Sequence, residues 1–477
     1  MIQEREAMKK NAEKGASTLI KTTSVYMIGS MLSKLLNLLI LPYISIELSA
    51  EQYGVYDLIQ TIVGVVLPIF TMQAIEAAFR FVYLETERRK KGKVISNVWC
   101  MIITGSFVFV ILLYLANFLV FHLEYANLLA LYFIFNVFIN MYQRIARCYD
   151  NNKVYAISGV IQTFVLLATQ IVFLYFFDMK EDGLVYAYCI SVVVACLYIE
   201  YNVKSIRDCS GKDISKTLLV KIVKFSAPLI PNSVSWWAVS SVNRIIIVAT
   251  MGYAANGIYS MANKFASIIT MIGSTFVLAW QEYVLSQKDN PDRKKLFSTV
   301  FAVFYFILAC CTAGGTLLQQ IFFKSLIDAE YAESFFYIPI IMLAVAISTL
   351  NSFWGVGYYA YEKTTGAFKT TIVGAVVNVA LGCLLVKDFG LYGIAFAGLF
   401  AYLIMWIARW VSMKSYFNIQ IQLKELFVPT TMIIVSFVGY YWNNNMISAV
   451  LICLICLGFL AKYKSILVDF IQKRKGK

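Results

Sequence analysis

The sequence predicts an all-α polytopic membrane protein, and three observations support this fold class. The 477-residue chain is 60% hydrophobic and only 14% charged, and its mean hydropathy of +0.71 lies far outside the range of soluble domains. Apolar runs of about 20 residues, the length of a membrane-crossing helix, recur along nearly the whole chain. The basic residues gather in alternate loops, as they do in multi-pass proteins.

About fourteen segments have the length and composition of transmembrane helices. Short polar loops separate them, and none shows the alternating pattern of a transmembrane β-barrel. The segments cover residues 18–44, 53–79, 95–120, 127–146, 154–177, 183–203, 222–250, 254–283, 297–322, 334–360, 367–386, 390–412, 425–442 and 446–463. Pro42, Pro68 and Pro339 are expected to kink or divide the segments that contain them.

The distribution of Lys and Arg orients these helices. With the N-terminus in the cytoplasm, 35 of the 41 basic residues fall in loops on that side, and only Lys180, Lys324 and Lys387 fall on the other. This split follows the positive-inside rule, and an even number of spans places both termini in the cytoplasm. It also explains the net charge of +14 without a nucleic-acid partner.

The three remaining basic residues, Lys34, Arg244 and Lys264, fall deep inside apolar segments. Arg244 and Lys264 lie on either side of a turn predicted at residues 252–254, about 12 to 16 Å below the outer face. An arginine at the centre of a membrane helix costs about 2.5 to 3.5 kcal/mol on insertion scales, so it needs compensation. Because no acidic residue falls at the same depth, we expect a water-filled cavity or an anionic ligand. Snorkelling of the lysines stays open as an alternative.

The two halves of the chain share one plan. At an offset of 203 residues the first and seventh segments align without gaps, with identities at Lys21 and Lys224, Ser30 and Ser233, Gly54 and Gly257, and Tyr56 and Tyr259. This offset equals six spans, so both copies cross the membrane in the same direction, and parallel lobes create a central interface where transporters bind substrates. We expect one lobe at 1–210, a second at 211–416, and an extra helix pair with a basic tail at 417–477.

Other kinds of site find little support in the sequence. His122 is the only histidine, which disfavours a His-ligated metal site. The CxxC spacing of Cys453 and Cys456 lies within a hydrophobic run, and the sequence contains no GxxxxGK[ST] phosphate-binding loop. We therefore expect neither a metal nor a bound cofactor.

The stretch FSAPLIPNSVSWWAVSSVNRIIIVATMGYAANGIYSMANKFASII, from Phe225 to Ile269, resembles polysaccharide and O-antigen flippases. These belong to the multidrug, oligosaccharidyl-lipid and polysaccharide (MOP) exporter superfamily. Its marks are a proline pair that opens the helix, the deep Arg244, and a Gly-x-Tyr step at the start of the next helix. LSAEQYGVYDL at 48–58 and GLYGIAFAGL at 390–399 resemble two further segments of the family. Many members carry Asp before the deep arginine, where this chain has Asn243.

The resemblance implies a MATE-like V of two six-helix bundles, two extra C-terminal helices, and alternating access. It implies a non-enzymatic flippase that moves an oligosaccharide, linked by diphosphate to a polyprenyl lipid, across the bacterial cytoplasmic membrane. The residues expected to bind the diphosphate are Arg244, Lys34 and Lys264, and those expected to contact sugars are Asn243, Ser233 and Ser240. The expected partners are the lipid bilayer and the polymerase and glycosyltransferases of the same pathway.

Several alternatives stay open. The energy source is the membrane potential, protons or sodium ions, with Glu76 and Asp57 as candidate coupling residues. A flippase for a cell-wall or sporulation lipid precursor is the nearest alternative function. A multidrug exporter would need deep carboxylates, and a membrane glycosyltransferase would need catalytic groups on a sizeable outer loop, whereas the outer loops here are about ten residues or shorter.

Overall fold

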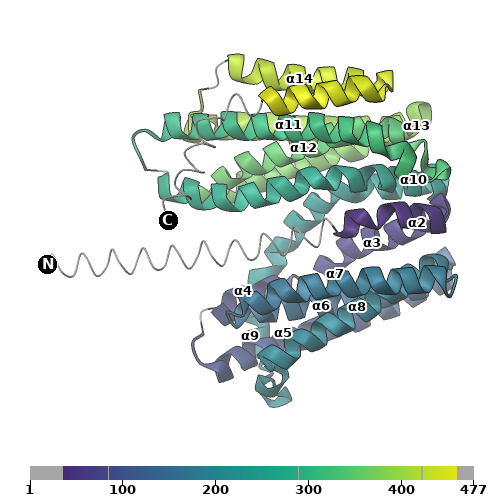
Figure 1. Ribbon diagram of the computed structural model, residues 1–477. Coiled ribbons are helices and arrows are strands. Elements are labelled where there is room, and N and C mark those ends of the chain that lie inside the picture. Colours follow the sequence, from purple (N-terminus) through teal and green to yellow (C-terminus); the bar gives the residue numbers. More distant parts are fainter. Residues whose placement is uncertain (1–35, 84, 288, 421–422, 459–477) are drawn as a thin grey trace, which may run out of the picture. The chain divides into compact units, whose positions relative to one another are not determined.

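The computed structural model describes residues 36–83, 85–287, 289–420 and 423–458, and the regular secondary structure within these ranges is helical (Figure 1). Ten helices in this part are long and apolar enough to cross a membrane, and two shorter apolar helices cover Leu36–Glu47 and Asn445–Gly458. The predicted all-helical membrane fold class is confirmed. The count of fourteen spans and the cytoplasmic location of both termini stay predictions.

The chain divides into two compact units. Unit 1 comprises Met1–Leu48 and Gln52–Trp237, and unit 2 comprises Ser49–Glu51 and Ala238–Lys477. The main division therefore falls within a helix, after Trp237. The lobe boundaries predicted at residues 210 and 416 stay predictions.

Unit 1 is built around helix α8. Its helices are α2 (Leu41–Glu47), most of α3 (Ala50–Phe70), α4 (Ala74–Tyr83), α5 (Arg88–Ala116), α6 (Ala126–Cys148), α7 (Asn152–Tyr175), α8 (Lys180–Val203) and α9 (Lys216–Ser226), and a π-helical turn, Asn117–Phe121, extends α5. Helix α8 packs along α6 and α7 (Figure 1). The predicted segment 53–79 is divided shortly after Pro68, because Met72 and Gln73 adopt left-handed φ values of 49° and 53° between α3 and α4.

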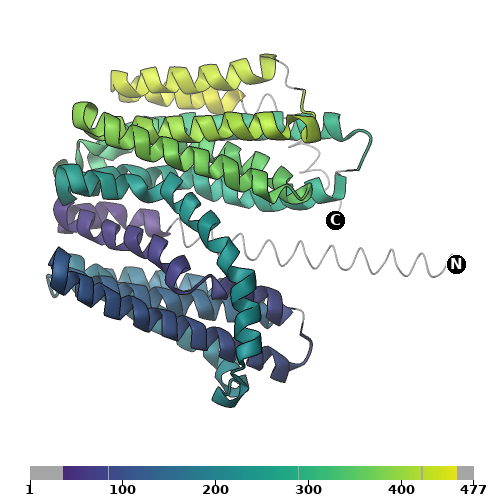
Figure 2. The same cartoon turned by 180° about the vertical axis from the view of Figure 1, so that it is seen from behind.

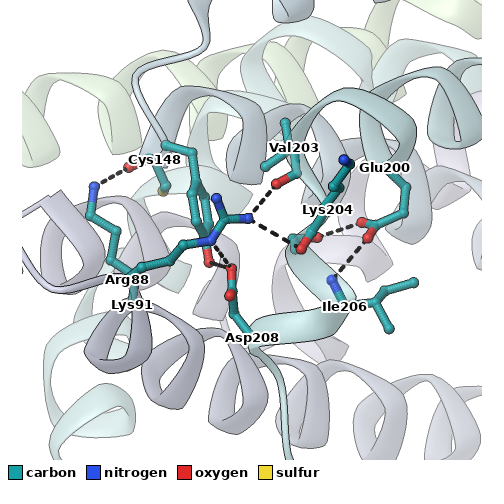
Figure 3. A network of polar contacts seen from close by, with 10 residues as sticks. Arg88, Lys91, Cys148, Glu200, Val203, Lys204, Ile206 and Asp208 are labelled. Carbon is teal, nitrogen blue, oxygen red and sulfur yellow. Dashed lines mark hydrogen bonds and ion pairs between the residues drawn. The ribbon is translucent and has the colours of Figure 1, made fainter.

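The segment between α8 and α9 is attached to α5 and α6 by polar contacts (Figure 3). It forms two 3-10 turns, Ser205–Asp208 and Gly211–Asp213. Arg88 Nε donates to Asp208 Oδ2 at 2.7 Å, and the Tyr149 hydroxyl donates to the same oxygen at 2.9 Å. Burial, followed by this hydrogen bond, raises the pKa of the Tyr149 hydroxyl, so it stays a donor at physiological pH.

A second attachment of this connector is fully buried. Asn97 on α5 is 0% exposed; its Nδ2 donates to the Asp213 carbonyl and its Oδ1 accepts from the Ser215 amide, both at 2.9 Å. Because two backbone groups at the end of the second turn are bonded to one buried side chain, this part of the connector is held against α5.

Unit 2 contains two helices that break in the middle. Its elements are α10 (Ile230–Gln287, from Ala238 onward), α11 (Arg293–Leu326), α12 (Ser334–Ala360), α13 (Thr364–Phe417) and α14 (Leu423–Trp442). Helix α10 breaks at Gly252 (φ 86°) and α13 at Gly390 (φ 54°), left-handed values that glycine adopts without strain. Both breaks fall where the sequence predicts a turn between apolar segments. Helix α12 packs along α13, and α11 along α14 (Figure 2).

Aromatic side chains fill the centre of unit 2. The rings of Trp280 and Phe353 stack with centroids 4.4 Å apart, and Trp280 Nε1 donates to the Phe353 carbonyl at 3.0 Å. Phe276 and Phe304 stack at 3.7 Å in the same cluster. Since lipid tails are as apolar as these side chains, close packing of this kind holds membrane helices together.

Candidate functional site

The first arm of α10 packs against α13 along one stripe. Val239, Asn243, Ile246 and Ile247 are buried and recur at helical spacing. Asn378 Nδ2 donates to the Val239 carbonyl at 3.0 Å, and Asn243 Nδ2 donates to the Ile394 carbonyl at 3.4 Å. Asn243, which is 4% exposed, therefore positions α10 against α13. Arg244 follows it by about 100° around the helix, which places the arginine beside this stripe.

Arg244 is half-buried in a polar neighbourhood within an apolar helix. Its Nη1 donates to the Ser240 carbonyl at 3.5 Å, and the exposed Ser240 hydroxyl lies 3.0 Å from that of Ser241. Tyr402, on the second arm of α13, lies within electrostatic range of Arg244. Unit 2 thus gathers a guanidinium and several hydroxyl groups at one place on α10.

Lys264 lies on the second arm of α10, across the break at Gly252 from Arg244. It is half-buried, and like Arg244 it interacts with other groups of the protein. The third predicted cation, Lys34, lies outside the described residues.

The other predicted site residues belong to unit 1. Ser233 accepts a hydrogen bond from Gln73 Nε2 at 2.6 Å. Glu76 forms an ion pair with Arg144, and its side chain is 47% exposed. Asp57 on α3 is 5% exposed. The two candidate coupling carboxylates therefore differ sharply in their environments.

The sequence analysis did not single out Arg409 as a buried cation, because it counted this residue among the 35 basic residues of the cytoplasmic side although Arg409 lies within the predicted segment 390–412. The structure places Arg409 inside α13 with only 2% exposure. Its Nη1 donates to the Asn351 carbonyl at 2.8 Å, and its Nη2 donates to Thr371 Oγ1 at 3.0 Å. The sequence feature that indicates its burial is its position in the apolar run FAYLIMWIARWV, with Trp410 directly after Arg409.

Asn351 connects this buried arginine to the neighbourhood of Arg244. Its Nδ2 donates to the Tyr402 carbonyl at 2.9 Å, and Tyr402 lies near Arg244. Arg409 is therefore linked through Asn351 to the backbone of Tyr402, the residue of α13 that lies within electrostatic range of Arg244.

The fold and these intramembrane cations define a multi-pass helical membrane protein with a transporter fold. The chain is similar to the lipid II flippase MurJ in an inward-closed conformation, with a TM-score of 0.72 and 16% identity, covering 93% of this chain and 99% of that one. It is also similar to an inward-facing multidrug resistance MATE family transporter of the MOP superfamily, with a TM-score of 0.61 and 14% identity, covering 83% and 98%. At these identities the likeness concerns the fold.

Residues 19–280, more than half of the chain, match the family described as polysaccharide biosynthesis protein, and the chain belongs to this family. An uncharacterised membrane protein of Haemophilus influenzae is 26% identical over 266 residues, covering 55% of this chain. The match spans 63% of that relative's length. The family predicted from the Phe225–Ile269 stretch is confirmed.

Proposed function

We propose that this protein is a flippase for a polyprenyl-diphosphate-linked oligosaccharide, the repeat unit of an O-antigen, capsule or exopolysaccharide. It moves this lipid from the inner to the outer leaflet of a bacterial cytoplasmic membrane by alternating access. The observation that carries the proposal is Arg244, half-buried in an apolar helix beside Ser240 and within electrostatic range of Tyr402. Membership of the polysaccharide biosynthesis family supports it.

The chemistry of a diphosphate suits these groups. A guanidinium bonds two phosphate oxygens at once, whereas an ammonium acts as a compact point charge. Arg244 therefore orients the diphosphate, and Lys264 and Lys34 add positive charge. The hydroxyls of Ser240 and Ser233 are available to sugars, while Asn243 holds α10 in place through its contact with α13. The polyprenyl tail remains in lipid, because it is equally apolar in either leaflet.

The membrane potential contributes to the driving force. A cytoplasm-negative potential favours outward movement of anionic charge by about 2.3 kcal/mol per charge per 100 mV. Exchange with protons or sodium ions would need a carboxylate shielded from bulk water. Asp57, at 5% exposure, suits this role better than Glu76, whose 47%-exposed side chain pairs with Arg144.

A flippase for a cell-wall lipid precursor is the second candidate function, and the TM-score of 0.72 to the lipid II flippase MurJ favours it. Both functions use a polyprenyl diphosphate, so the phosphate-binding role of Arg244 is common to them. They differ in the glycan, which interacts with side chains that vary among transporters of one fold.

The test replaces Arg244 in cells and identifies the lipid that accumulates. Arg244→Ala, at normal membrane abundance, is expected to leave a polyprenyl-linked glycan on the inner leaflet, and mass spectrometry of that glycan separates the two functions. Arg207→Ala, an exposed arginine of unit 1, is the matched control and should export normally. Unchanged export in the Arg244 variant would overturn the proposed role of this residue.

A further inference from the structure

Four cations on three helices of unit 1 lie against aromatic rings on or next to the C-terminal half of α4. They are Arg80 on α4, Arg144 and Arg147 on α6, and Lys221 on α9, which we call the cationic rim. The predicted topology places this end of the unit at the cytoplasmic face. Glu76 pairs with Arg144 and offsets one of the four positive charges.

Aromatic rings support the α9 side of the rim. The guanidinium of Arg80 lies 4.4 Å from the centre of the Phe225 ring, and Lys221 Nζ lies 5.5 Å from that of Phe81. The two rings pack edge to face at 5.7 Å. Because Arg80 and Lys221 are exposed, their charges remain accessible while the rings restrict their side chains.

A second ring supports the α6 side. Phe79 lies beneath two guanidiniums, 5.7 Å from that of Arg144 and 5.1 Å from that of Arg147. Arg147 also lies 5.7 Å from the centre of the Tyr155 ring. Cation–π contacts leave the positive charge intact, and side chains that are already ordered lose less entropy when they bind a ligand.

The choice of arginine indicates what this rim binds. Only 11 of the 41 basic residues of the chain are arginines, yet three of them lie in the rim. Topological anchoring needs positive charge alone, which lysine supplies equally well. Arginine adds a planar fork of donors that matches the oxygens of a phosphate group. Helix α4 follows α3 at the end of the apolar segment predicted at 53–79, and the predicted topology puts that end near the lipid headgroups of the cytoplasmic leaflet.

We infer that the cationic rim binds the phosphate-bearing headgroup of a lipid in the cytoplasmic leaflet. Two lipids carry this chemistry: the polyprenyl diphosphate that the proposed function moves, and an anionic phospholipid. The first assignment rests on the proposed function and makes the rim a site that holds the substrate headgroup at the cytoplasmic leaflet.

The experiment measures binding rather than transport. The full chain carrying Arg244→Ala is placed in phosphatidylcholine nanodiscs, so that binding to the proposed central site is weakened, and is titrated with farnesyl diphosphate. Adding Arg80→Gln and Arg147→Gln is expected to raise the Kd about tenfold. The matched control adds Lys204→Gln and Arg207→Gln, which remove the same charge at exposed positions outside the rim, and should leave the Kd within about twofold.

A lysine variant distinguishes the effect of positive charge from that of guanidinium geometry. It also shows whether weaker binding occurs in a protein that is still folded. Arg80→Lys with Arg147→Lys keeps the charge but removes the planar forks, and is expected to bind about threefold more weakly at unchanged thermal stability. Repeating the titration with phosphatidylglycerol in the discs identifies the lipid. If the Kd for farnesyl diphosphate is unchanged in phosphatidylglycerol discs, the rim binds the diphosphate substrate. If phosphatidylglycerol displaces farnesyl diphosphate, the rim binds an ordinary anionic phospholipid.

Two results would overturn the inference: a Kd that is unchanged in the Gln rim variant, or an equal rise in the control. Failure of the rim is distinguishable from failure of the proposed function. Normal export by Arg244→Ala cells would reject the phosphate-binding role of Arg244 on which the proposed function rests and leave the binding result standing, whereas unaltered binding in the rim variant would reject only the rim.

Discussion

Two arginines of unit 2 differ in their burial and in their hydrogen-bond partners, and we expect them to differ in role. Arg244 is half-buried and comes directly after Asn243, a residue of the buried stripe that packs against α13. Its side chain lies beside the polar groups of Ser240. Arg409 is 2% exposed and is held by Asn351, Thr370 and Thr371. We propose that the first meets the diphosphate, whereas the second donates hydrogen bonds that join α12 and α13.

Replacing Arg409 should therefore affect folding. Arg409→Met keeps much of the side-chain volume but removes the charged hydrogen bonds, and we expect it to lower the free energy of unfolding by about 3 kcal/mol. Thermal or denaturant unfolding of the detergent-solubilised protein measures the change. Lys414→Met, at an exposed position on the same helix, should change stability by less than about 0.5 kcal/mol. Equal effects of the two substitutions would contradict this account.

At the scale of elements, the second arm of α10 approaches the backbone at the start of α3 very closely. A Cβ added to Gly257 would lie 1.8 Å from the Ala50 carbonyl oxygen. Ala50 is itself fixed, because its amide donates to Glu330 at 2.7 Å and the neighbouring Ser49 carbonyl accepts from the Tyr331 hydroxyl at 2.9 Å. The backbone therefore has little freedom to move away.

Gly257→Ala is expected to destabilise the protein by about 2 kcal/mol or more, because it forces two backbone segments apart. The control is Gly314→Ala, where an added Cβ meets nothing within 4 Å. That substitution should be neutral or stabilise α11 by up to about 1 kcal/mol, since alanine favours helix more than glycine does. Melting temperatures of the two variants measure the contrast, and similar values would refute it.

The connector between α8 and α9 depends on one buried amide. Asn97→Ala removes the hydrogen bonds to Asp213 and Ser215 at the end of the second turn, and should cost about 2 kcal/mol of stability. Faster proteolysis within residues 205–215 would reveal the loosened connector. Asn202→Ala, whose amide is exposed and bonds only within its own helix, should leave proteolysis unchanged. Equal protection in both variants would show that the connector is held by other contacts.

At the scale of the whole molecule, the distribution of charge predicts topology. With 35 basic residues on one side and three on the other, both termini are expected in the cytoplasm. Tags placed at each end should be protected from membrane-impermeant reagents in intact cells and become labelled once the membrane is opened. Labelling of one tag in intact cells would mean an odd number of spans.

The sequence predicted the membrane class, the positions of most helices and the breaks at Gly252 and Gly390, because these depend on local apolar length and on glycine. It also identified the family from the stretch around Arg244. It did not place Arg409, because loop and buried arginines look alike when a cation lies near the end of an apolar run. The sequence also did not predict that segment 53–79 is divided at residues 71–73, since Pro68 indicates a bend but not the form of the bend.

By itself, the sequence determined the helical membrane class and the family, and it predicts which way the chain faces, since hydrophobic length and the distribution of basic residues can be read along the chain. Only the tertiary structure decided that Asn243 donates a hydrogen bond to α13 with Arg244 beside that contact, and that the four cations of the rim lie against aromatic rings on or next to α4. The physical reason is that hydrogen bonds and ring contacts act over a few ångströms. The groups they join lie tens to hundreds of residues apart, so only the packed helices decide which of them meet.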